Sequence, residues 1–541
     1  MTELREIFIE KVERALREVG ADIVEFDQNL KVPAWDITVD RHGHIWPLRL
    51  VTVGWNIDVL PAIYWRIPTP IWGWPHVSSS GDVCVSDREG LEYDPDDIIG
   101  VIEWLLEEAT RLLACSFMMT EAERHSAFAN ELEGYLRNDG SSSVILDEKI
   151  NSTKSLYAEV ALVKKGRNGP FTPKVCRINQ ASTKLLHCHQ ERLGLLDVTI
   201  PQLHGLLSEW EDGWWDAFLG VLSPTQRSIV TSPKNRGAVL RIPSRFGYSL
   251  LLLYWGARSA KMRSTYVIQR QDHEYLVRRT GGEPVMRHVI IAGCGSIGSR
   301  VAEYLALAGV NKITLIDNDK FSADNLGRHV LGKKSISKFK VDELASLLKE
   351  RMPGVQIEAK VTSVQSALAK GDLASADAIV LATGNSTLER SVARRGFKEK
   401  WTSLIISTSV EAAGLGGHAI AMRAGTPGCL DCLYIDPDTQ QSLPSMRTAL
   451  IAPGQKVTRQ LTGCGAFTPY SALDATRTAI LAAERVLNNI PLYSRWVGEA
   501  VLAKTEGIQP SATYDALHAR RIASNIAPSE FAQPRCPCCG F

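Results

Sequence analysis

Three glycines stand at a spacing that lets a protein backbone approach a phosphate group. They belong to the stretch Gly293-Cys294-Gly295-Ser296-Ile297-Gly298, which follows the β-branched run 289–291 and precedes a helical run. Such glycines permit a tight turn and close packing of helix on strand, and the helix N-terminus attracts an anion. The next apolar run, 313–316, ends at Asp317, where a carboxylate can accept hydrogen bonds from a ribose. The pattern predicts a nucleotide site at Gly293, Gly295, Gly298 and Asp317.

The polar segment that follows contains groups suited to phosphoryl chemistry. It holds an acid-x-acid pair that ends at Asp319, then Asn325-Leu326-Gly327-Arg328, and Lys340 opens the next helical run. Cations and hydrogen-bond donors stabilise the charge that builds on phosphoryl oxygens in a transition state. This order of residues resembles the signature of the ubiquitin-activating and ThiF/MoeB adenylating superfamily. Lys338 is an alternative to Lys340 as the lysine of that signature.

The resemblance implies an ATP-dependent reaction. Members of the superfamily bind ATP, and the C-terminal carboxylate of a protein attacks its α-phosphate, which gives an acyl-adenylate and pyrophosphate. The implied cofactors are ATP and Mg²⁺, and the implied contacts are Asp319, Asn325, Arg328 and Lys340, the last two also catalytic. The superfamily usually has an aspartate after the strand-like run 377–383, which helps to hold magnesium or ATP. Here Gly384 occupies that position, so magnesium must be held from elsewhere or less tightly.

Four of the eleven cysteines form two Cys-x-x-Cys pairs about a hundred residues apart. Thiolates at this spacing reach one tetrahedral zinc ion without strain, and two such pairs close its coordination shell. The pairs are Cys429 with Cys432 and Cys536 with Cys539, and Cys538 is an alternative fourth ligand with a less suitable gap. We therefore expect a structural Zn²⁺ site rather than four free thiols.

Cys84 follows a proline-rich loop in the stretch Trp74-Pro75-His76-Val77-Ser78-Ser79-Ser80-Gly81-Asp82-Val83-Cys84. A cysteine that carries a thioester needs partial exposure and a thiolate, which a loop beside a helix start can provide. The stretch resembles the active-site segment of ubiquitin-conjugating enzymes, which begins His-Pro-Asn. His76 replaces the asparagine of that family and could stabilise an oxyanion by donating a hydrogen bond. The alternative is a cysteine that packs as a small hydrophobic residue.

Cys464 lies in the segment Gly463-Cys464-Gly465-Ala466-Phe467-Thr468-Pro469, which precedes the helical run 472–487. Enzymes that activate ubiquitin-like proteins, to which this region is similar, place their thioester cysteine just before this helix. A helix N-terminus lowers the pKa of a thiol, as a nucleophile requires. The resemblance thus implies that Cys464 is the activating cysteine, although sulfur-carrier enzymes also have a cysteine nearby.

Periodic patterns predict the elements that must position these residues. Helical periodicity over 3–19, strand-like runs at 34–39, 44–53 and 63–67, and an amphipathic helix over 97–113 indicate an α+β module. The middle has strand-like runs at 157–163 and 238–242 and helical ones within 200–219. We expect an α+β domain over 1–140 and a mixed linker domain over 141–280, followed by an α/β, Rossmann-like domain with a parallel sheet over 281–541. The resemblances imply that the first is a ubiquitin-conjugating-like domain and the last a ThiF-like adenylation domain.

The composition limits which partners and which cellular compartment we expect for this protein. The chain has 541 residues, 45% hydrophobic and 22% charged, and its net charge of +1 gives no reason to expect nucleic acid or an anionic membrane as partner. The acidic N-terminus does not read as a secretory signal, and the most apolar run, 250–255, is too short to span a bilayer. We expect a cytoplasmic protein without a membrane or nucleic-acid partner.

The whole pattern resembles a fused activating and conjugating enzyme of the ubiquitin type, similar to those of bacterial CBASS antiphage operons. The resemblance implies adenylation of a protein C-terminus, thioester formation on Cys464, transfer to Cys84 and attack by an amine of a target protein. The implied substrate is a cGAS-like nucleotidyltransferase or a ubiquitin-like protein, and a homodimer is expected, with Arg278 or Arg279 reaching across it. Two alternatives remain, a sulfur-carrier adenylyltransferase and a non-catalytic scaffold that binds a nucleotide.

Overall fold

A computed structural model describes the chain except for residues 1, 28–31, 68–72, 79, 87–90, 139–141, 147–149, 151–154, 165–170, 180–188, 208–213, 246, 257–263, 459–466, 521–523 and 541. It divides into two compact units. The first comprises the described residues up to Leu146 and from Ile150 to Gln269, and the second begins at Arg270. The two units differ in extent from the three predicted domains, which stay a prediction.

The first unit begins with a helix and an antiparallel sheet. Helix α1 (Thr2–Glu18) is followed by strands β1 (Ala21–Asp27), β2 (Ala34–Arg41), β3 (His44–Val51) and β4 (Ala62–Trp65), which pair in that order. Trp35, Ile37 and Val39 alternate along β2 and are buried, as the two-residue period of a strand requires. Helix α2 (Ile98–Met118) begins where Asp97 accepts a hydrogen bond from the Gly100 amide, and its apolar face shares the same core. The two helices and three strands that the sequence predicts for this region are therefore present as α1, α2, β2, β3 and β4.

The rest of the first unit is a closed barrel with a helix packed on it. Helix α3 spans Glu121–Asn138. The barrel strands are β5 (Ser142–Leu146), β6 (Leu156–Lys164), β7 (Phe171–Asn179), β8 (His189–Asp197), β9 (Asn235–Ser244), β10 (Gly247–Tyr254) and β11 (Ser264–Arg270), and they close in the order β10-β11-β5-β7-β6-β8-β9. Between β8 and β9 come α4 (Ile200–Leu207), α5 (Trp214–Val221) and α6 (Pro224–Thr231). Closure gives each described strand a neighbour on both sides.

The second unit is built on an eight-stranded sheet with the order β14-β13-β12-β15-β16-β17-β18-β19. Its strands are β12 (Val285–Ala292), β13 (Val310–Ile316), β14 (Gln356–Lys360), β15 (Ala378–Leu381), β16 (Leu404–Val410), β17 (Gly416–Met422), β18 (Leu492–Val497) and β19 (Ser524–Ile526). Five neighbouring strands, β14, β13, β12, β15 and β16, run parallel to one another. The three remaining pairs, β16 with β17, β17 with β18 and β18 with β19, are antiparallel. The predicted Rossmann-like parallel arrangement is thus present, with an antiparallel extension.

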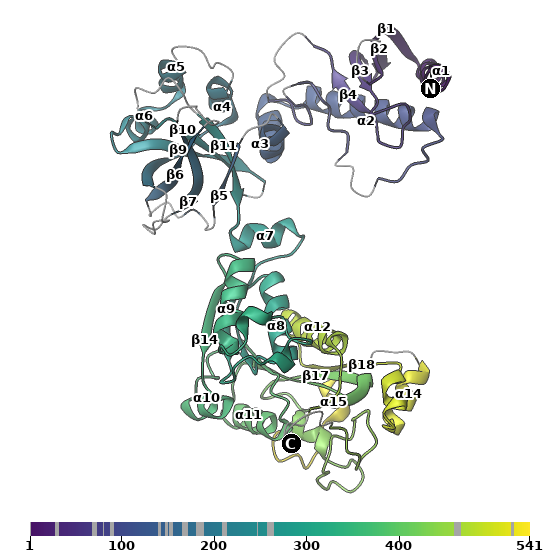
Figure 1. Cartoon of the computed structure of the whole chain (residues 1–541), viewed down its shortest axis with the longest axis vertical. Helices are drawn as coiled ribbons and strands as arrows, with labels where there is room; N and C mark the ends of the chain where they lie inside the picture. Colours follow the sequence, from purple (N-terminus) through teal and green to yellow (C-terminus); the bar gives the residue numbers. More distant parts are fainter. Residues whose placement is uncertain are drawn as a thin grey trace. The chain divides into compact units, whose positions relative to one another are not determined.

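Helices cover both faces of this sheet. The α-helices are α7 (His273–Arg279), α8 (Ser296–Leu307), α9 (Lys340–Arg351), α10 (Val364–Lys370), α11 (Ser386–Lys398), α12 (Ala472–Asn488), α13 (Val501–Thr505), α14 (Ala512–Arg520) and α15 (Pro528–Phe531). On one face Val289 and Ile291 of β12 share a core with α8, α9 and α12, and α8 and α12 lie side by side (Figure 1). Ile290 and Ala292 face the opposite core. Burial on both faces explains why β12 is a continuous apolar run.

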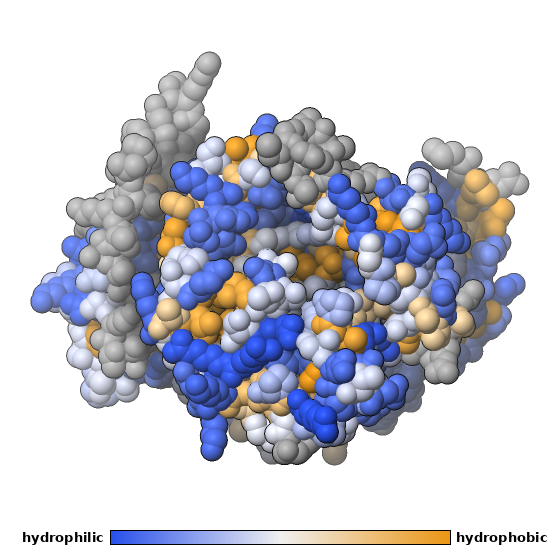
Figure 2. Space-filling model, turned by 90° about the horizontal axis from the view of Figure 1, so that it is seen from below, coloured by the Kyte–Doolittle hydropathy of each residue, from blue (hydrophilic) through white to orange (hydrophobic). Residues whose placement is uncertain are grey.

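Two further observations concern membrane-spanning helices and the distribution of hydrophobic residues on the surface. Among the described residues, no helix is long and apolar enough to cross a membrane. On the face seen in Figure 2, hydrophobic residues occur in separate small groups among hydrophilic ones.

Candidate functional site

The glycine loop joins β12 to α8, and each predicted glycine has a different environment. Gly293 has a φ of +91°, and a Cβ there would lie 2.7 Å from the Ala382 carbonyl oxygen. A Cβ on Gly298 would lie 1.9 Å from the Gly293 carbonyl oxygen, whereas one on Gly295 would meet open space. Gly293 and Gly298 are therefore required by packing, and Gly295 keeps the start of α8 accessible. No side chain among the described residues caps that end of α8, so its first amides remain available to an anion.

Asp317 and His329 hold this loop in place. One Asp317 carboxylate oxygen accepts the Cys294 amide hydrogen at 2.7 Å, and the other accepts the Asp319 amide hydrogen at 2.8 Å. Nδ1 of His329 accepts the Leu331 amide hydrogen at 3.0 Å, so Nε2 carries the proton and donates to the Cys294 carbonyl oxygen at 2.8 Å. Burial lowers the pKa of His329 to about 4, which keeps it neutral. Asp317 ties the loop and is not among the described cavity-lining residues, and its predicted contact with a ribose stays a prediction.

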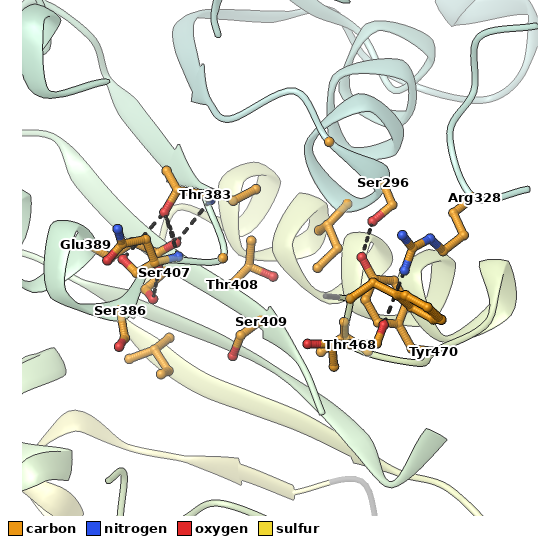
Figure 3. A pocket seen from close by; sticks show the side chains of 18 of the residues that line it. Ser296, Arg328, Thr383, Ser386, Glu389, Ser407, Thr408, Ser409, Thr468 and Tyr470 are labelled. Carbon is orange, nitrogen blue, oxygen red and sulfur yellow. Dashed lines mark hydrogen bonds between the residues drawn. The ribbon is translucent and has the colours of Figure 1, made fainter. Parts of the chain in front are cut away.

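A cavity of about 690 Å³ opens at the start of α8, within the size range of small-molecule sites. Its walls come from the glycine loop, the polar segment after β13, the ends of β15 and β16, and the segment before α12. Figure 3 shows Thr383, Glu389 and Ser407 on one side and Ser296, Arg328 and Tyr470 on the other. The predicted residues that line it are Gly295, Asp319, Asn325 and Arg328. A ligand site at the carboxyl ends of parallel strands is the usual location in such folds.

Lys340 lies beside this cavity. Its ammonium is 2.8 Å from a carboxylate oxygen of Asp319, and its side chain is only 9% exposed. Lys338, the alternative lysine, is 56% exposed and pairs with Glu343 at 3.0 Å. Of the two lysines, Lys340 is the one that pairs with a residue lining the cavity.

Arg328 is oriented by two contacts from the segment before α12. Its guanidinium stacks over the Tyr470 ring at 4.5 Å and donates to the Thr468 carbonyl oxygen at 3.3 Å. The Tyr470 hydroxyl in turn lies 2.6 Å from the Ser296 hydroxyl, in the first turn of α8 (Figure 3). Asn325 caps its own 3-10 turn by accepting from the Ser322 amide at 3.1 Å. These contacts fix a permanent cation near the end of the helix where an anion is favoured.

Glu389 forms a buried hydrogen-bond network at the other end of the cavity. Its carboxylate accepts from the Thr383 amide and hydroxyl at 3.1 and 2.8 Å and from the Ser407 hydroxyl at 2.5 Å (Figure 3). Burial raises the pKa of Glu389 to about 7, although the hydrogen bonds from Ser407 and Thr383 act to lower it. The network connects the turn after β15 to β16.

The position expected to carry a magnesium-binding aspartate holds Gly384, whose φ of +67° suits glycine. Asp319 and Glu389 are the carboxylates among the described lining residues, and the donors around Glu389 already occupy its oxygens. Asp319 is therefore the acid best placed to contact a cation in this cavity.

Cys464 lies outside the described residues. Phe467 and Thr468, which line the cavity, follow it by three and four positions in the sequence. Arg278, predicted to cross a dimer interface, pairs with Glu283 at 2.8 Å within its own chain.

The four predicted zinc ligands come together. The sulfurs of Cys429, Cys432, Cys536 and Cys539 all lie within 4.8 Å of one another, the closest pairs 3.4, 3.5 and 4.0 Å apart. Four sulfurs at about 2.3 Å from a tetrahedral zinc would be about 3.8 Å apart, so the donor set fits that ion. Cys538 is not part of this group.

A buried carboxylate links this cluster to the cavity. Asp431, between the first two cysteines, pairs with Arg390 and Arg394 of α11. The Arg390 guanidinium also stacks at 4.3 Å over Tyr434, a cavity-lining residue. The cluster therefore supports one wall of the cavity.

Cys84 lies in the first unit, on the loop between β4 and α2, and it is exposed. Its amide donates to the His76 carbonyl oxygen at 2.7 Å, and Val77 and Val83 form the neighbouring bridge. His76 and Cys84 therefore face each other across a short antiparallel pair. The exposure argues against the alternative of a cysteine packed in the core.

Sequence reasoning missed several cavity residues. Glu389 and Tyr470 stand alone in their local sequence, and only the tertiary fold brings them to the glycine loop. His329 directly follows Arg328, and this position in the signature segment is the one sequence signal that could have indicated its role at the glycine loop.

Comparison with known proteins agrees with this geometry. Residues 285–531 match the ThiF family. The chain is 27% identical over 231 residues to the ATP-dependent ubiquitin transferase-like protein Cap2 of Pseudomonas aeruginosa, covering 41% of this chain and 40% of that protein. It is 30% identical over 166 residues to the sulfur carrier protein ThiS adenylyltransferase of Escherichia coli. This match covers 30% of this chain and 62% of that protein.

A solved structure of E. coli MccB matches with a TM-score of 0.33 and 19% identity, covering 47% of this chain and 65% of that one. The chain spans about two fifths of the length of the first curated relatives it matches. The glycine loop, the cavity and the cysteine cluster all fall within, or directly beside, the matched residues 285–531, and this part of the chain is a ThiF family domain.

Proposed function

We propose that the second unit uses ATP to adenylate the C-terminal carboxylate of a protein. The observation that carries the proposal is the pair of cations, Arg328 and Lys340, at a cavity that opens on the uncapped N-terminus of α8. The ThiF family match and the similarity to a protein named as an adenylyltransferase support the same reaction. An NAD-dependent oxidation has no comparable support, because the described lining residues contain no paired histidine and acid in ring-to-carboxylate contact.

Each group has a role in this reaction. The amides of the α8 start bind phosphoryl oxygens, and Lys340 and Arg328 stabilise the charge that develops when the carboxylate attacks the α-phosphorus and pyrophosphate leaves. Asp319 holds Lys340 and is the residue that would contact Mg²⁺, which when bound neutralises phosphate charge. The cysteine cluster would hold a structural Zn²⁺ and so stabilise the segment that carries the Tyr434 wall.

We further propose that two cysteines carry the activated acyl group. Cys464 takes it from the adenylate as a thioester, Cys84 receives it by transthiolation, and the amine of a target protein then attacks. The similarity to Cap2, a protein named ATP-dependent ubiquitin transferase-like, supports this sequence, as does the exposure of Cys84. The substrate in this proposal is a ubiquitin-like protein or a cGAS-like nucleotidyltransferase of a CBASS-like antiphage system. The active form is a homodimer in the cytoplasm.

Pyrophosphate exchange tests the adenylation step. Labelled pyrophosphate should enter ATP when a purified ubiquitin-like protein or cGAS-like nucleotidyltransferase with an intact C-terminus is present, and a truncated tail serves as the control. The Lys340→Ala variant should lose exchange, and the Lys338→Ala variant should keep it. Exchange that does not depend on Lys340, or no exchange with any intact tail, would contradict the proposal.

A non-reducing gel separates conjugation from the sulfur-carrier alternative, which the similarity to ThiS adenylyltransferase favours. In the conjugating enzyme, Cys84→Ala stops product formation and lets the acyl group accumulate on Cys464. A sulfur-carrier enzyme would instead form its product equally well with Cys84→Ala.

A further inference from the structure

The loop that carries Cys84 is held by a carboxylate from helix α3. The His76 amide donates to Oε2 of Glu131 at 3.1 Å, and Nδ1 of the His76 ring lies 3.1 Å from Oε1. An ionised carboxylate only accepts hydrogen bonds, so Nδ1 carries the proton and Nε2 of the neutral ring is left as an acceptor. The Tyr135 hydroxyl, one turn further along α3, also donates to Glu131.

This arrangement costs backbone strain, which the contacts must offset. His76 has a φ of +62°, in the left-handed region that residues other than glycine rarely adopt. The backbone and ring of His76 both bind Glu131, so the carboxylate fixes the residue in this conformation. The strained residue stands directly opposite Cys84.

Helices α2 and α3 bring further titratable groups close to His76. Burial, then the Glu131 charge, raises the pKa of the Tyr135 phenol, so it stays a donor, and the Cys84 thiolate acts in the same direction. On α2, Glu108 also acts on His76, but its carboxylate is paired with Arg111, whose Nε donates at 2.9 Å.

From this geometry we propose that Glu131 and Tyr135 are positioning residues that make His76 a general base beside the Cys84 thioester. The inference rests on the proposed function of Cys84 as an acyl carrier. The neutral amine of the target attacks the thioester carbonyl carbon, so a C–N bond forms and the C–S bond breaks. Nε2 of His76 takes the proton from the amine nitrogen, and the Cys84 thiolate that leaves then receives it. Glu131 stabilises the imidazolium in between, as in other acid–imidazole–nucleophile arrangements.

Helix α3 also packs on the barrel. Phe128, Ala129 and Leu132 share a core with barrel residues, and the Ser249 hydroxyl donates to the Ala129 carbonyl oxygen at 2.8 Å. The barrel therefore supports the helix that positions His76, which gives this part of the first unit a role in the transfer step.

The experiment bypasses the adenylation site. The full-length protein is loaded at Cys84 with a short peptide glycyl thioester of 2-mercaptoethanesulfonate, with Cys84→Ala as the loading control. Discharge to free lysine is then followed after removal of the excess thioester. We expect Glu131→Gln to load within about twofold of wild type and to discharge about tenfold or more slowly, since general-base catalysis contributes 10²–10⁴-fold. Tyr135→Phe should slow discharge about fivefold.

The pH dependence distinguishes positioning from a structural role. The ratio of wild-type to Glu131→Gln discharge rates cancels the ionisation of lysine, and we expect this ratio to vary with pH, because a general base must be unprotonated to accept the proton. Glu121→Gln, an exposed change on the same helix, should leave discharge unchanged. A ratio that does not vary with pH, or equal discharge by wild type and Glu131→Gln, overturns the inference. Failure of wild-type Cys84 to load overturns the proposed function itself, and the inference with it.

Discussion

The Lys340 ammonium lies 2.8 Å from the Asp319 carboxylate, and the Lys340 amide donates to the Asp319 carbonyl oxygen at 3.0 Å. Two hydrogen bonds between the same two residues fix the first residue of α9 against the cavity. The pairing gives the buried ammonium a counter-charge, without which its burial would be costly.

Replacing Lys340 by alanine should weaken ATP binding. The ammonium is the type of charged donor whose hydrogen bonds contribute about 1.5–3 kcal/mol, so we expect the dissociation constant to rise about 10- to 100-fold. Isothermal titration with ATP measures it. Lys338→Ala is the matched control and should bind as wild type does, since Lys338 pairs with Glu343 instead. Equal weakening by the two changes would contradict the assignment.

Two glycine substitutions should separate packing from ligand approach. Gly298→Ala places a Cβ against the Gly293 carbonyl oxygen and should destabilise the protein by about 1–3 kcal/mol. Gly295→Ala meets no atom within 4 Å, so the protein should fold normally while ATP binding falls about tenfold, ~1.4 kcal/mol. Urea unfolding and ATP titration measure the two effects. Wild-type ATP affinity in Gly295→Ala would show that phosphate does not approach this loop.

Glu389 should make stability depend on pH in an unusual direction. Its pKa is about 7 in the folded protein and 4.5 in the unfolded chain, so the folded protein binds the proton more tightly. The free energy of unfolding should therefore fall as pH rises from about 4.5 to 7, by at most about 3 kcal/mol. Glu389→Gln should remove this contribution and flatten the dependence. Urea unfolding at pH 5 and pH 8 tests it, and an identical pH dependence in both proteins would contradict the burial argument.

The cysteine cluster predicts one zinc ion per chain. Cys536→Ser should lose the metal and lower the thermal midpoint by at least about 5 °C, because zinc binding contributes directly to folding. Cys538→Ser, two residues away and outside the cluster, should retain both. Zinc is measured by mass spectrometry of the purified protein and stability by calorimetry. Full zinc content in Cys536→Ser would rule out this ligand set.

The sequence predicted the parts of the site that depend on local spacing. The glycine loop and each Cys-x-x-Cys pair follow from short patterns, because their geometry is fixed within a few residues, and the four ligands of a tetrahedral zinc ion join the two distant pairs. Spacing alone left Lys338 and Lys340 as alternatives, because the difference lies in which carboxylate each one meets.

What the sequence could not predict depends on contacts between distant segments. The barrel closes through pairs such as β10 with β11 and β8 with β9, whose registers are not set by any local signal. Glu131 is one of several acids on an amphipathic helix, and only its contact with His76 distinguishes it. The same holds for Glu389, whose partners are Thr383, in the turn after β15, and Ser407 of β16.

The central claim is that ATP binds in the cavity at the start of α8, and a crystal structure with magnesium and the analogue AMPCPP tests it most directly. The account predicts phosphate density against the amides of Gly295 and Ser296, with Lys340 and Arg328 in contact with phosphoryl oxygens. A nucleotide bound elsewhere, or an empty cavity at saturating analogue, would contradict it.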